Sequence, residues 1–313
     1  MPSARLATLA IDGAPVAAVV DGDAAHPLPG VASIRELLGD LDGALEQIEV
    51  DLAAGRLGEG LALETVEFLP PVPDPPHLYM AGGNYADHAR EMNDLGPDDA
   101  IPRPAAGPFF FLKPTSTLTG HLAPVTRPAS VSRLDWEVEL AAVIGRRAHR
   151  VSEADAMRHV AAYTVANDIS ARDSFVREDS EGAMTYDWLR HKGWHTSCPC
   201  GPSLLAARDC DDPQDLGLRL SVNGELMQNS STAEMIFSLA EQVAYLSAIV
   251  PLVPGDIICT GTCAGVGAGR GRFLQGGDVM VAEIDLIGSL ENPVVDEAGR
   301  SAAPAGVAVG QAG

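Results

Sequence analysis

The amino-acid sequence predicts a mainly β fold with helical decorations, preceded by a small α+β segment. Three observations carry this prediction. From residue 77 onward, short apolar runs alternate with glycine and proline, a pattern typical of strands joined by turns rather than of a βαβ repeat. Residues 33–55 have apolar side chains at helical spacing. Between these regions, segment 70–76 contains five prolines.

Residues 1–70 are expected to form a small N-terminal domain. Two apolar runs within residues 5–28 are separated by an Asp-Gly turn, which predicts a hairpin. The helix predicted over residues 33–55 begins at Ser33, a side chain that commonly caps helices. Because proline fits neither a helix interior nor a central strand, we expect a linker over residues 70–76.

Residues 77–297 are expected to form the main β domain. Its predicted strands are Leu78–Ala81, Phe109–Leu112, Trp136–Ile144, Tyr163–Ala166, Leu218–Val222, Asp256–Cys259 and Asp278–Ile287. Helices are predicted from Ser152 to about residue 162 and over residues 233–249. The Ala/Gly-rich residues 298–313 are expected to be a flexible tail.

Composition excludes several functional classes. A net charge of −22 argues against nucleic acids and anionic membranes as partners. The sequence has no apolar run long enough for a transmembrane helix and no signal-peptide pattern. The five cysteines are an odd number, which indicates reduced thiols and a cytoplasmic location.

Lysine is found at only two positions, Lys113 and Lys192, among 21 lysines and arginines. An ammonium is a compact, titratable charge, whereas a guanidinium is planar and always charged. Lys113 follows three phenylalanines and is therefore expected to be buried. The alternative is that codon bias has left two ordinary surface lysines.

The clearest chemical pattern is the pair Glu137 and Glu139 within an otherwise apolar run. On a strand the two side chains point to the same face, roughly 6–7 Å apart. Such a pair is costly unless a cation lies between the carboxylates; the alternative is a solvated polar face. Asp168, at the end of another apolar run, is a third candidate ligand. Three oxygen donors suit Mg²⁺ or Mn²⁺, with Ca²⁺ possible, rather than zinc.

A candidate acid–base pair follows Gly82-Gly83. If the next residues form a short helix, His88 and Glu91 lie one turn apart, and Glu91 can orient the imidazole for proton transfer. The alternative is a solvated surface histidine. The polar, Pro/Gly-punctuated residues 93–104 are expected to be mobile without substrate and to close as a lid.

Six motifs in this order resemble the fumarylacetoacetate hydrolase superfamily, in its acylpyruvate hydrolase and oxaloacetate decarboxylase-like branch. They are Gly82/Asn84/Tyr85/His88, Phe111/Lys113/Pro114, Asp135 to Leu140, Asn167/Asp168/Ser170, Lys192/Thr196/Gly201/Pro202 and Gly261/Thr262/Gly265/Val266/Gly267. The resemblance covers about residues 77–294. It implies a mixed β-roll catalytic domain over residues 77–297 and a homodimer.

The resemblance also implies site roles: metal ligands Glu137, Glu139 and Asp168, a lid dyad of His88 and Glu91, and an active-site Lys192. Substrates of the family are small anionic 2-oxo or 1,3-dioxo acids. We therefore expect hydrolytic C–C cleavage of an acylpyruvate-like acid, in which the metal and an ammonium stabilise the enolate. Oxaloacetate decarboxylation and dienoate hydratase or isomerase chemistry are alternatives, as is a catalytically silent small-acid binding protein.

Five further side chains are expected to contact the substrate: Arg172, Gln228, Thr262, Lys113 and His195. For Arg172 the alternative is a salt bridge with Asp173 or Glu178. Thr262 lies in a Gly-rich loop whose N–H groups can approach an anion. His195 replaces an aspartate that many relatives carry, so it bears on substrate identity.

Overall fold

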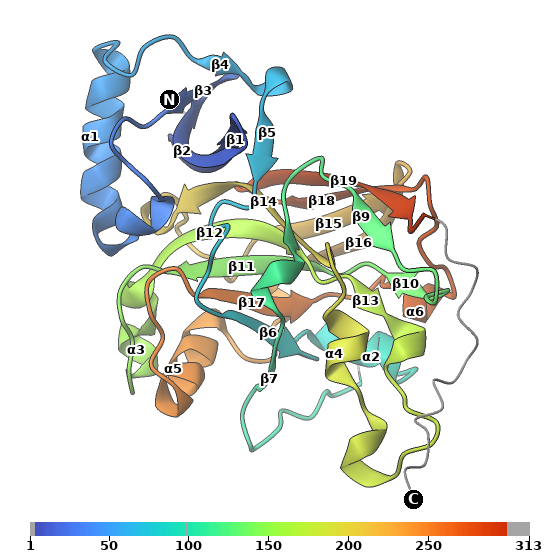
Figure 1. The fold of residues 1–313 in the computed structure, drawn as a ribbon. Helices are drawn as coiled ribbons and strands as arrows, with labels where there is room; N and C mark the ends of the chain where they lie inside the picture. Colours follow the sequence, from blue (N-terminus) through green and yellow to red (C-terminus); the bar gives the residue numbers. More distant parts are fainter. Residues whose placement is uncertain (1–3, 98, 299–313) are drawn as a thin grey trace, which may run out of the picture.

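The computed structural model describes residues 4–97 and 99–298, and the mainly β fold is confirmed (Figure 1). The strands are β1 (Arg5–Ile11), β2 (Ala14–Asp21), β3 (Ala24–Pro27), β4 (Leu61–Ala62), β5 (Glu67–Leu69), β6 (Leu78–Gly82), β7 (Phe109–Leu112), β8 (Leu118–Thr119), β9 (Val125–Arg127), β10 (Leu134–Asp135), β11 (Val138–Ile144), β12 (Val160–Asn167), β13 (Ser170–Ala171), β14 (Cys198–Ala206), β15 (Gly217–Val222), β16 (Glu225–Ser231), β17 (Ile257–Thr262), β18 (Val279–Ile284) and β19 (Gly288–Asp296). The α-helices are α1 (Leu41–Ala53), α2 (Ala86–Met92), α3 (Glu153–Ala156), α4 (Trp188–Lys192), α5 (Leu239–Ile249) and α6 (Gly267–Arg270).

One large sheet runs through the molecule in the order β4-β3-β2-β1-β14-β12-β11-β17-β6-β7, with β5 beside β1 and β8 beside β14. A second sheet has the order β16-β15-β18-β19-β9, and β10 pairs with β13. Figure 1 shows α3 and α5 near β11, β12 and β17. Buried side chains of α5 pack on one face of these central strands, and buried side chains of α1 pack on the other. This cover on both faces explains the nearly continuous apolar sequences of β11 and β12.

The N-terminal region has the predicted hairpin, extended by a third strand. Its helix α1 is shorter than predicted, because residues 34–36 and 38–40 form 3-10 turns before it begins. Ser33 caps the first of these turns, accepting a hydrogen bond from the backbone N–H of Arg35. Strand β1 pairs with β14 through Leu6 and Leu204, so the sheet continues across the predicted domain boundary. The division at residue 70 stays a prediction.

Two predicted helices of the main domain have different bounds. The helix predicted from Ser152 ends at Ala156, because the residues from Val160 pair with β11 as strand β12 and bury their side chains in the core. The other begins at Leu239, where Ser238 and Glu241 form a capping box. In both cases tertiary pairing of the flanking residues shortens the helix that local sequence favours. The predicted tail lies outside the described residues, apart from residue 298.

Strand β11 separates the core into two parts. Leu140 and Ala142 pack on one face with the five-stranded sheet, whereas Ala141 and Val143 pack on the other with α1. By alternation, Glu139 shares the face of Ala141. This assignment places the candidate metal site on the α1-facing side of the large sheet.

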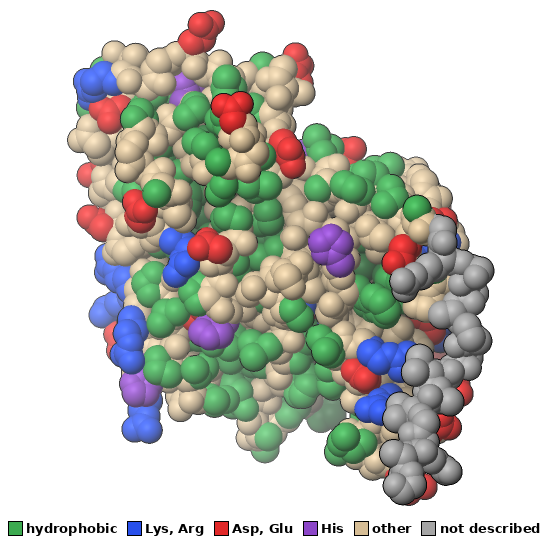
Figure 2. All heavy atoms as spheres, viewed as in Figure 1, with side chains coloured by type: hydrophobic (Ala, Val, Ile, Leu, Met, Phe, Trp, Pro, Cys, Tyr) green, Lys and Arg blue, Asp and Glu red, His purple; other side chains and the backbone are tan. Residues whose placement is uncertain are grey.

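The positive charges are unevenly placed. Figure 2 shows Lys and Arg side chains gathered along the edge of the molecule that carries α3, a part of the chain with several exposed arginines: Arg146, Arg147, Arg150 and Arg158. The side chains of Lys113 and Lys192, in contrast, are 0% and 5% exposed. The interpretation of the lysines as chance surface residues is therefore wrong. Within the described residues, no helix is long and apolar enough to cross a membrane.

Candidate metal and acid–base site

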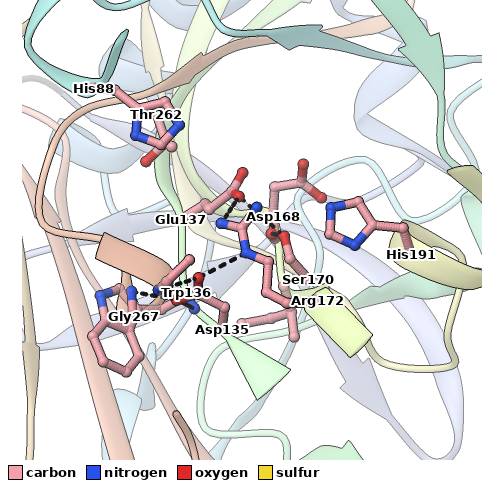
Figure 3. A network of polar contacts seen from close by, with 12 residues as sticks. His88, Asp135, Trp136, Glu137, Asp168, Ser170, Arg172, His191, Thr262 and Gly267 are labelled. Carbon is pink, nitrogen blue, oxygen red and sulfur yellow. Dashed lines mark hydrogen bonds and ion pairs between the residues drawn. The ribbon is translucent and has the colours of Figure 1, made fainter. Parts of the chain in front are cut away.

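Three buried carboxylates converge where β11 begins and β12 ends. One oxygen from each of Glu137, Glu139 and Asp168 lies within 4.8 Å of the others. The strand register brings them together, because Val138 lies opposite Asn167. The backbone N–H of Asp168 donates to the carbonyl of Glu137 at 2.8 Å. Figure 3 shows Glu137 and Asp168 side by side at the centre of the network.

Two cations contact this cluster from α4 and from the loop after β13. The ammonium of Lys192 lies 2.8 Å from Glu137 Oε2 and 2.6 Å from Asp168 Oδ2, and the guanidinium of Arg172 lies 2.5 Å from Glu137 Oε1. Burial raises the pKa of Glu137, but Lys192 and Arg172 outweigh it and hold that pKa below its usual range. The two cations therefore favour the ionised form of Glu137.

Glu139 has a different environment. Its carboxylate accepts a 2.8 Å hydrogen bond from the backbone N–H of Gly261 and has no ion pair among the described residues. Burial, together with the nearby charges of Asp168 and Glu137, raises the pKa of Glu139 well above its ordinary value. A positive charge next to Glu139 would remove this penalty, and all three donors are oxygens. The cluster therefore fits a hard divalent cation.

Lys113 lies beneath the cluster, with all three ammonium protons engaged. It forms an ion pair with Asp168 and donates to the carbonyls of Ile169 at 3.1 Å and Ser197 at 2.6 Å. Since an ammonium has three donors, none is left for a substrate in this arrangement. These contacts favour a role in holding Asp168 over the predicted contact with substrate.

Arg172 is close to the carboxylate cluster, where protein carboxylates hold it, and its predicted contact with substrate stays a prediction. Besides its contact with Glu137, its Nε donates to Asp135 Oδ2 at 2.8 Å. The expected alternative, a salt bridge with Asp173 or Glu178, is wrong, because Asp173 instead accepts from the backbone and hydroxyl of the Ser132 turn.

Asp135 is a site residue to which the sequence analysis gave no role. It is fully buried and also accepts hydrogen bonds from the backbone N–H groups of Gly267 at 2.6 Å and Ala268 at 2.9 Å. It thereby joins Arg172 to the start of α6. The alternation of acidic residues at 135, 137 and 139 could have identified it.

Gln228 and Thr262 are buried beside β11. The amide oxygen of Gln228 accepts from Val138 N–H at 3.0 Å, and its nitrogen donates to Thr262 Oγ1 and to the carbonyl of Cys263, both at 2.9 Å. Thr262 in turn donates to the carbonyl of Val138 at 2.8 Å. The side chains of Gln228 on β16 and Thr262 on β17 therefore both form hydrogen bonds to the backbone of β11. His195 is exposed in the loop after α4. Substrate contacts for these three residues stay predictions.

The candidate acid–base pair lies on α2, and Figure 3 shows His88 above Glu137. His88 Nδ1 is 3.6 Å from Glu91 Oε2, and both oxygens of Glu91 are 3.0 Å from the backbone nitrogen of Gly265. Burial raises the pKa of Glu91, but His88 and this N–H outweigh it, and the pKa is lowered overall. The charge of His88 also contributes to the low pKa of Glu137, which is consistent with His88 facing the carboxylates.

Two other side chains at the site, Ser170 and His191, were given no role by the sequence analysis, although Ser170 is part of one of its motifs. Ser170 Oγ lies 2.8 Å from the carbonyl of Asp168 and 3.1 Å from Glu137 Oε1. His191 is buried, with Nδ1 3.0 Å from the carbonyl of Ala171, so this nitrogen carries the proton. Burial and the adjacent Lys192 lower the pKa of His191 to about 4. No sequence pattern distinguished His191 from a surface histidine.

Comparison with known proteins agrees with this geometry. The family model described as fumarylacetoacetate (FAA) hydrolase C-terminal matches residues 77–295. The chain is 37% identical to the mitochondrial oxaloacetate tautomerase fahd2 of Xenopus laevis over 297 residues, which covers 94% of this chain and 87% of the relative.

Among solved structures, a probable 2-hydroxyhepta-2,4-diene-1,7-dioate isomerase from Mycobacterium abscessus superposes with a TM-score of 0.75 at 32% identity, covering 94% of this chain and 100% of that one. A maleylpyruvate hydrolase from Sphingobium sp. SYK-6, in complex with manganese(II) and pyruvate, gives 0.74 at 28% identity, covering 93% and 99%. These relatives are tautomerases, isomerases and hydrolases of small acids. This chain belongs to the fumarylacetoacetate hydrolase family.

Proposed function

We propose that this chain is a metal-dependent hydrolase that cleaves a C–C bond of an acylpyruvate-like 1,3-dioxo acid. The observation that carries the proposal is the buried set of three carboxylates with an ammonium 2.6–2.8 Å away, faced by a His-Glu pair on a separate helix. Cleavage of a 1,3-dioxo acid needs both parts: stabilisation of an enolate and a base for water.

Glu137, Glu139 and Asp168 would hold the cation, with Mg²⁺ or Mn²⁺ as the proposed ion and Ca²⁺ as the third possibility. The manganese in the Sphingobium maleylpyruvate hydrolase complex supports this assignment. When bound, the ion would supply Lewis-acid stabilisation of negative charge on the substrate's neighbouring oxygens. Lys192 adds a fixed positive charge beside Glu137 and Asp168, and burial raises its electrostatic effect.

In the proposed reaction His88 takes a proton from water, and Glu91 orients the imidazole. The resulting hydroxide adds to the acyl carbonyl. The bond between this carbon and the pyruvate methylene then breaks, and its electron pair passes to the three-carbon unit as an enolate. His88 returns the proton to the former methylene carbon, which becomes the methyl group of pyruvate. The products are a carboxylic acid and pyruvate, so one water is consumed and the atoms balance.

Keto–enol tautomerisation of oxaloacetate is a second candidate. It needs proton transfer at one carbon but no attacking water, so the same His88 and Glu91 pair suffices. The 37% identity to the Xenopus oxaloacetate tautomerase over most of both chains favours it. Oxaloacetate decarboxylation and dienoate hydration or isomerisation use the same enolate stabilisation. A silent acid-binding protein would keep the carboxylate cluster but would have no need of the His-Glu pair.

We also propose a homodimer and a cytoplasmic location. Strand β7 is at the edge of the large sheet, and Leu112 on it and Leu189 on α4 are 61% and 65% exposed, so a second copy could cover them. All five cysteines are free and buried, which suits a reducing compartment, although the Xenopus relative is mitochondrial. Light scattering and cell fractionation test these two points.

The deciding experiment compares acetylpyruvate and oxaloacetate with Mn²⁺- or Mg²⁺-loaded protein. We expect stoichiometric release of pyruvate and acetate from acetylpyruvate, with none from the chelator-treated protein or the Glu139→Gln variant. Enol–keto conversion of oxaloacetate, followed by ultraviolet absorbance, without any cleavage of acetylpyruvate would favour the tautomerase. Binding of oxalate with no turnover of either acid would favour the silent protein.

A further inference from the structure

A group of aromatic side chains lies directly beside the ammonium of Lys192. Helix α4 presents Trp188 and Lys192 four residues apart, hence on one helix face. Both contact the same ring: Phe111 is 4.9 Å from Trp188 between ring centroids, and its centroid is 5.6 Å from Lys192 Nζ. Phe109 lies 5.2 Å from Trp188 and extends the group outward. We call Phe109, Phe111 and Trp188 the aromatic wall.

The strand register places this wall on the same sheet face as the metal ligands. Along the row across the sheet, Ala141 lies opposite Cys259, Cys259 beside Met80, and Met80 opposite Phe111. Ala141 is on the face of Glu139. The wall and the carboxylate cluster therefore belong to one surface of the large sheet.

Two glycines, Gly261 and Gly82, lie between the carboxylate cluster and the aromatic wall, in the row of paired residues that follows Cys259 and Met80. Gly261 donates its N–H to Glu139, and continuing the β17–β6 register places it next to Gly82, which lies opposite Phe109. Side chains from neighbouring segments cover both glycines, since a Cβ at Gly261 would lie 3.0 Å from Asn84 Cβ and one at Gly82 would lie 2.7 Å from the Phe109 ring. The wall is accessible, since Phe109 is 49% exposed.

The cations at the cluster are already neutralised. Lys192 contacts two carboxylates, Arg172 contacts two, and Lys113 contacts one carboxylate and two carbonyls. Because each of these three groups is already paired with protein carboxylates, its attraction for a second carboxylate at the far end of a substrate is weakened. Aromatic rings, in contrast, stack favourably with planar apolar groups.

We propose that the aromatic wall is a specificity subsite that binds a planar apolar substituent on the distal end of the substrate. On this view, which rests on the proposed function, the preferred substrates are acylpyruvates with an aromatic or conjugated acyl group. Short-chain and dicarboxylic acids are disfavoured, the first for lack of contact with the rings and the second because the nearby cations are already paired with protein carboxylates.

The test uses 2-oxo acids that have no second oxo group and cannot be cleaved. Calorimetry of the Mn²⁺-loaded protein compares 4-phenyl-2-oxobutanoate with 2-oxobutanoate, which lacks the ring, and 2-oxoglutarate, which has a carboxylate in its place. We expect the phenyl acid to bind roughly tenfold more tightly than 2-oxobutanoate and 2-oxoglutarate to bind no better than 2-oxobutanoate.

Variants of the wall residues test whether the aromatic wall causes the preference for the phenyl acid. Trp188→Ala, and Phe109→Leu as a milder second change, should weaken binding of the phenyl acid roughly three- to tenfold and leave 2-oxobutanoate unchanged. Leu226→Ala is the control, since Leu226 is a 51% exposed apolar residue on β16, a strand of the other sheet. It should alter neither affinity.

Equal affinity of wild-type protein for the phenyl acid and 2-oxobutanoate would overturn the proposal, as would equal weakening of both ligands in the two wall variants. Dissociation of a dimer by Trp188→Ala with the phenyl preference intact would assign the wall to a subunit contact and also overturn it. If the phenyl preference is found but benzoylpyruvate is not cleaved, the subsite stands and the proposed hydrolysis fails.

Discussion

Both carboxylate oxygens of Glu91 lie 3.0 Å from the backbone nitrogen of Gly265. Gly265 has φ +100° and a Cβ at this position would lie 2.1 Å from the carbonyl oxygen of Met227, so only glycine can present its N–H here. Gly261, near the end of the preceding strand β17, donates to Glu139. The glycine-rich segment 261–267 therefore contacts both the helix that carries His88 and a candidate metal ligand.

The His-Glu pair gives the first prediction. His88→Ala should reduce turnover roughly 10²–10⁴-fold, the usual range for loss of a general base, and Glu91→Gln should come close to this because it loses the charge that orients the imidazole. Metal binding should persist in both. Steady-state kinetics and calorimetry measure the two effects, and Asn93→Ala at the end of α2 is the control. Wild-type turnover in His88→Ala would remove the pair from the mechanism.

The carboxylate cluster gives the second prediction. Glu137→Gln and Glu139→Gln should each abolish stoichiometric Mn²⁺ binding, since each removes one of three charged ligands from a buried site. Metal content after dialysis, measured by elemental analysis, is the readout. Glu283→Gln, an exposed position on β18, should retain the metal. Full occupancy at unchanged affinity in both cluster variants would contradict the assignment.

Metal affinity should depend on pH because of Glu139. Its raised pKa means that the metal-free protein keeps a proton there above the ordinary range for glutamate, and a cation must displace it. Affinity should therefore rise with pH, by up to about tenfold per pH unit for one displaced proton, and stop rising once Glu139 is ionised without metal. Calorimetry in buffers of different ionisation enthalpy counts the protons released. Affinity that is independent of pH would refute this linkage.

His191 should make the metal-free protein less stable in acid. Its pKa in the folded state is lowered from 6.5 to about 4, so the unfolded chain gains a proton first as pH falls. Stability should be unaffected well above pH 6.5 and decrease below it, reaching a loss of about 3 kcal/mol once the pH is below the folded pKa. Urea unfolding should show a shallower decrease for His191→Asn, whose amide can still donate to Ala171. Parallel pH profiles would show that His191 does not contribute.

Lys113 should be needed for stability rather than for substrate affinity. Lys113→Met leaves the buried Asp168 without one partner, and loss of one member of a buried ion pair typically costs about 3–5 kcal/mol. We expect a lower urea midpoint with little change in the KM of protein that remains folded. A normal midpoint combined with a large increase in KM would instead support the substrate contact predicted from sequence.

The sequence by itself determined the elements whose local pattern and packing agree. The hairpin at residues 5–28 and strand β7 were predicted with bounds close to those observed, and a short helix carrying His88 was expected without bounds. The three candidate ligands were also recognisable, because Glu137 and Glu139 interrupt an apolar run and Asp168 ends another. Their meeting in one cluster also depends on the fold, because Glu137 lies just before β11 and its carbonyl accepts from the backbone N–H of Asp168.

Only the tertiary structure decided which buried cation pairs with which buried carboxylate. Sequence could not show that Arg172 pairs with Asp135 and Glu137, nor that Lys113 is fully engaged beneath Asp168, since these partners are 35 to 55 residues apart. It also could not place Trp188 against Phe111, whose contact depends on strand register and on where α4 docks. Pairing across distant segments follows from three-dimensional packing, and it is this packing that distinguishes a side chain that holds the site from one that is free to bind substrate.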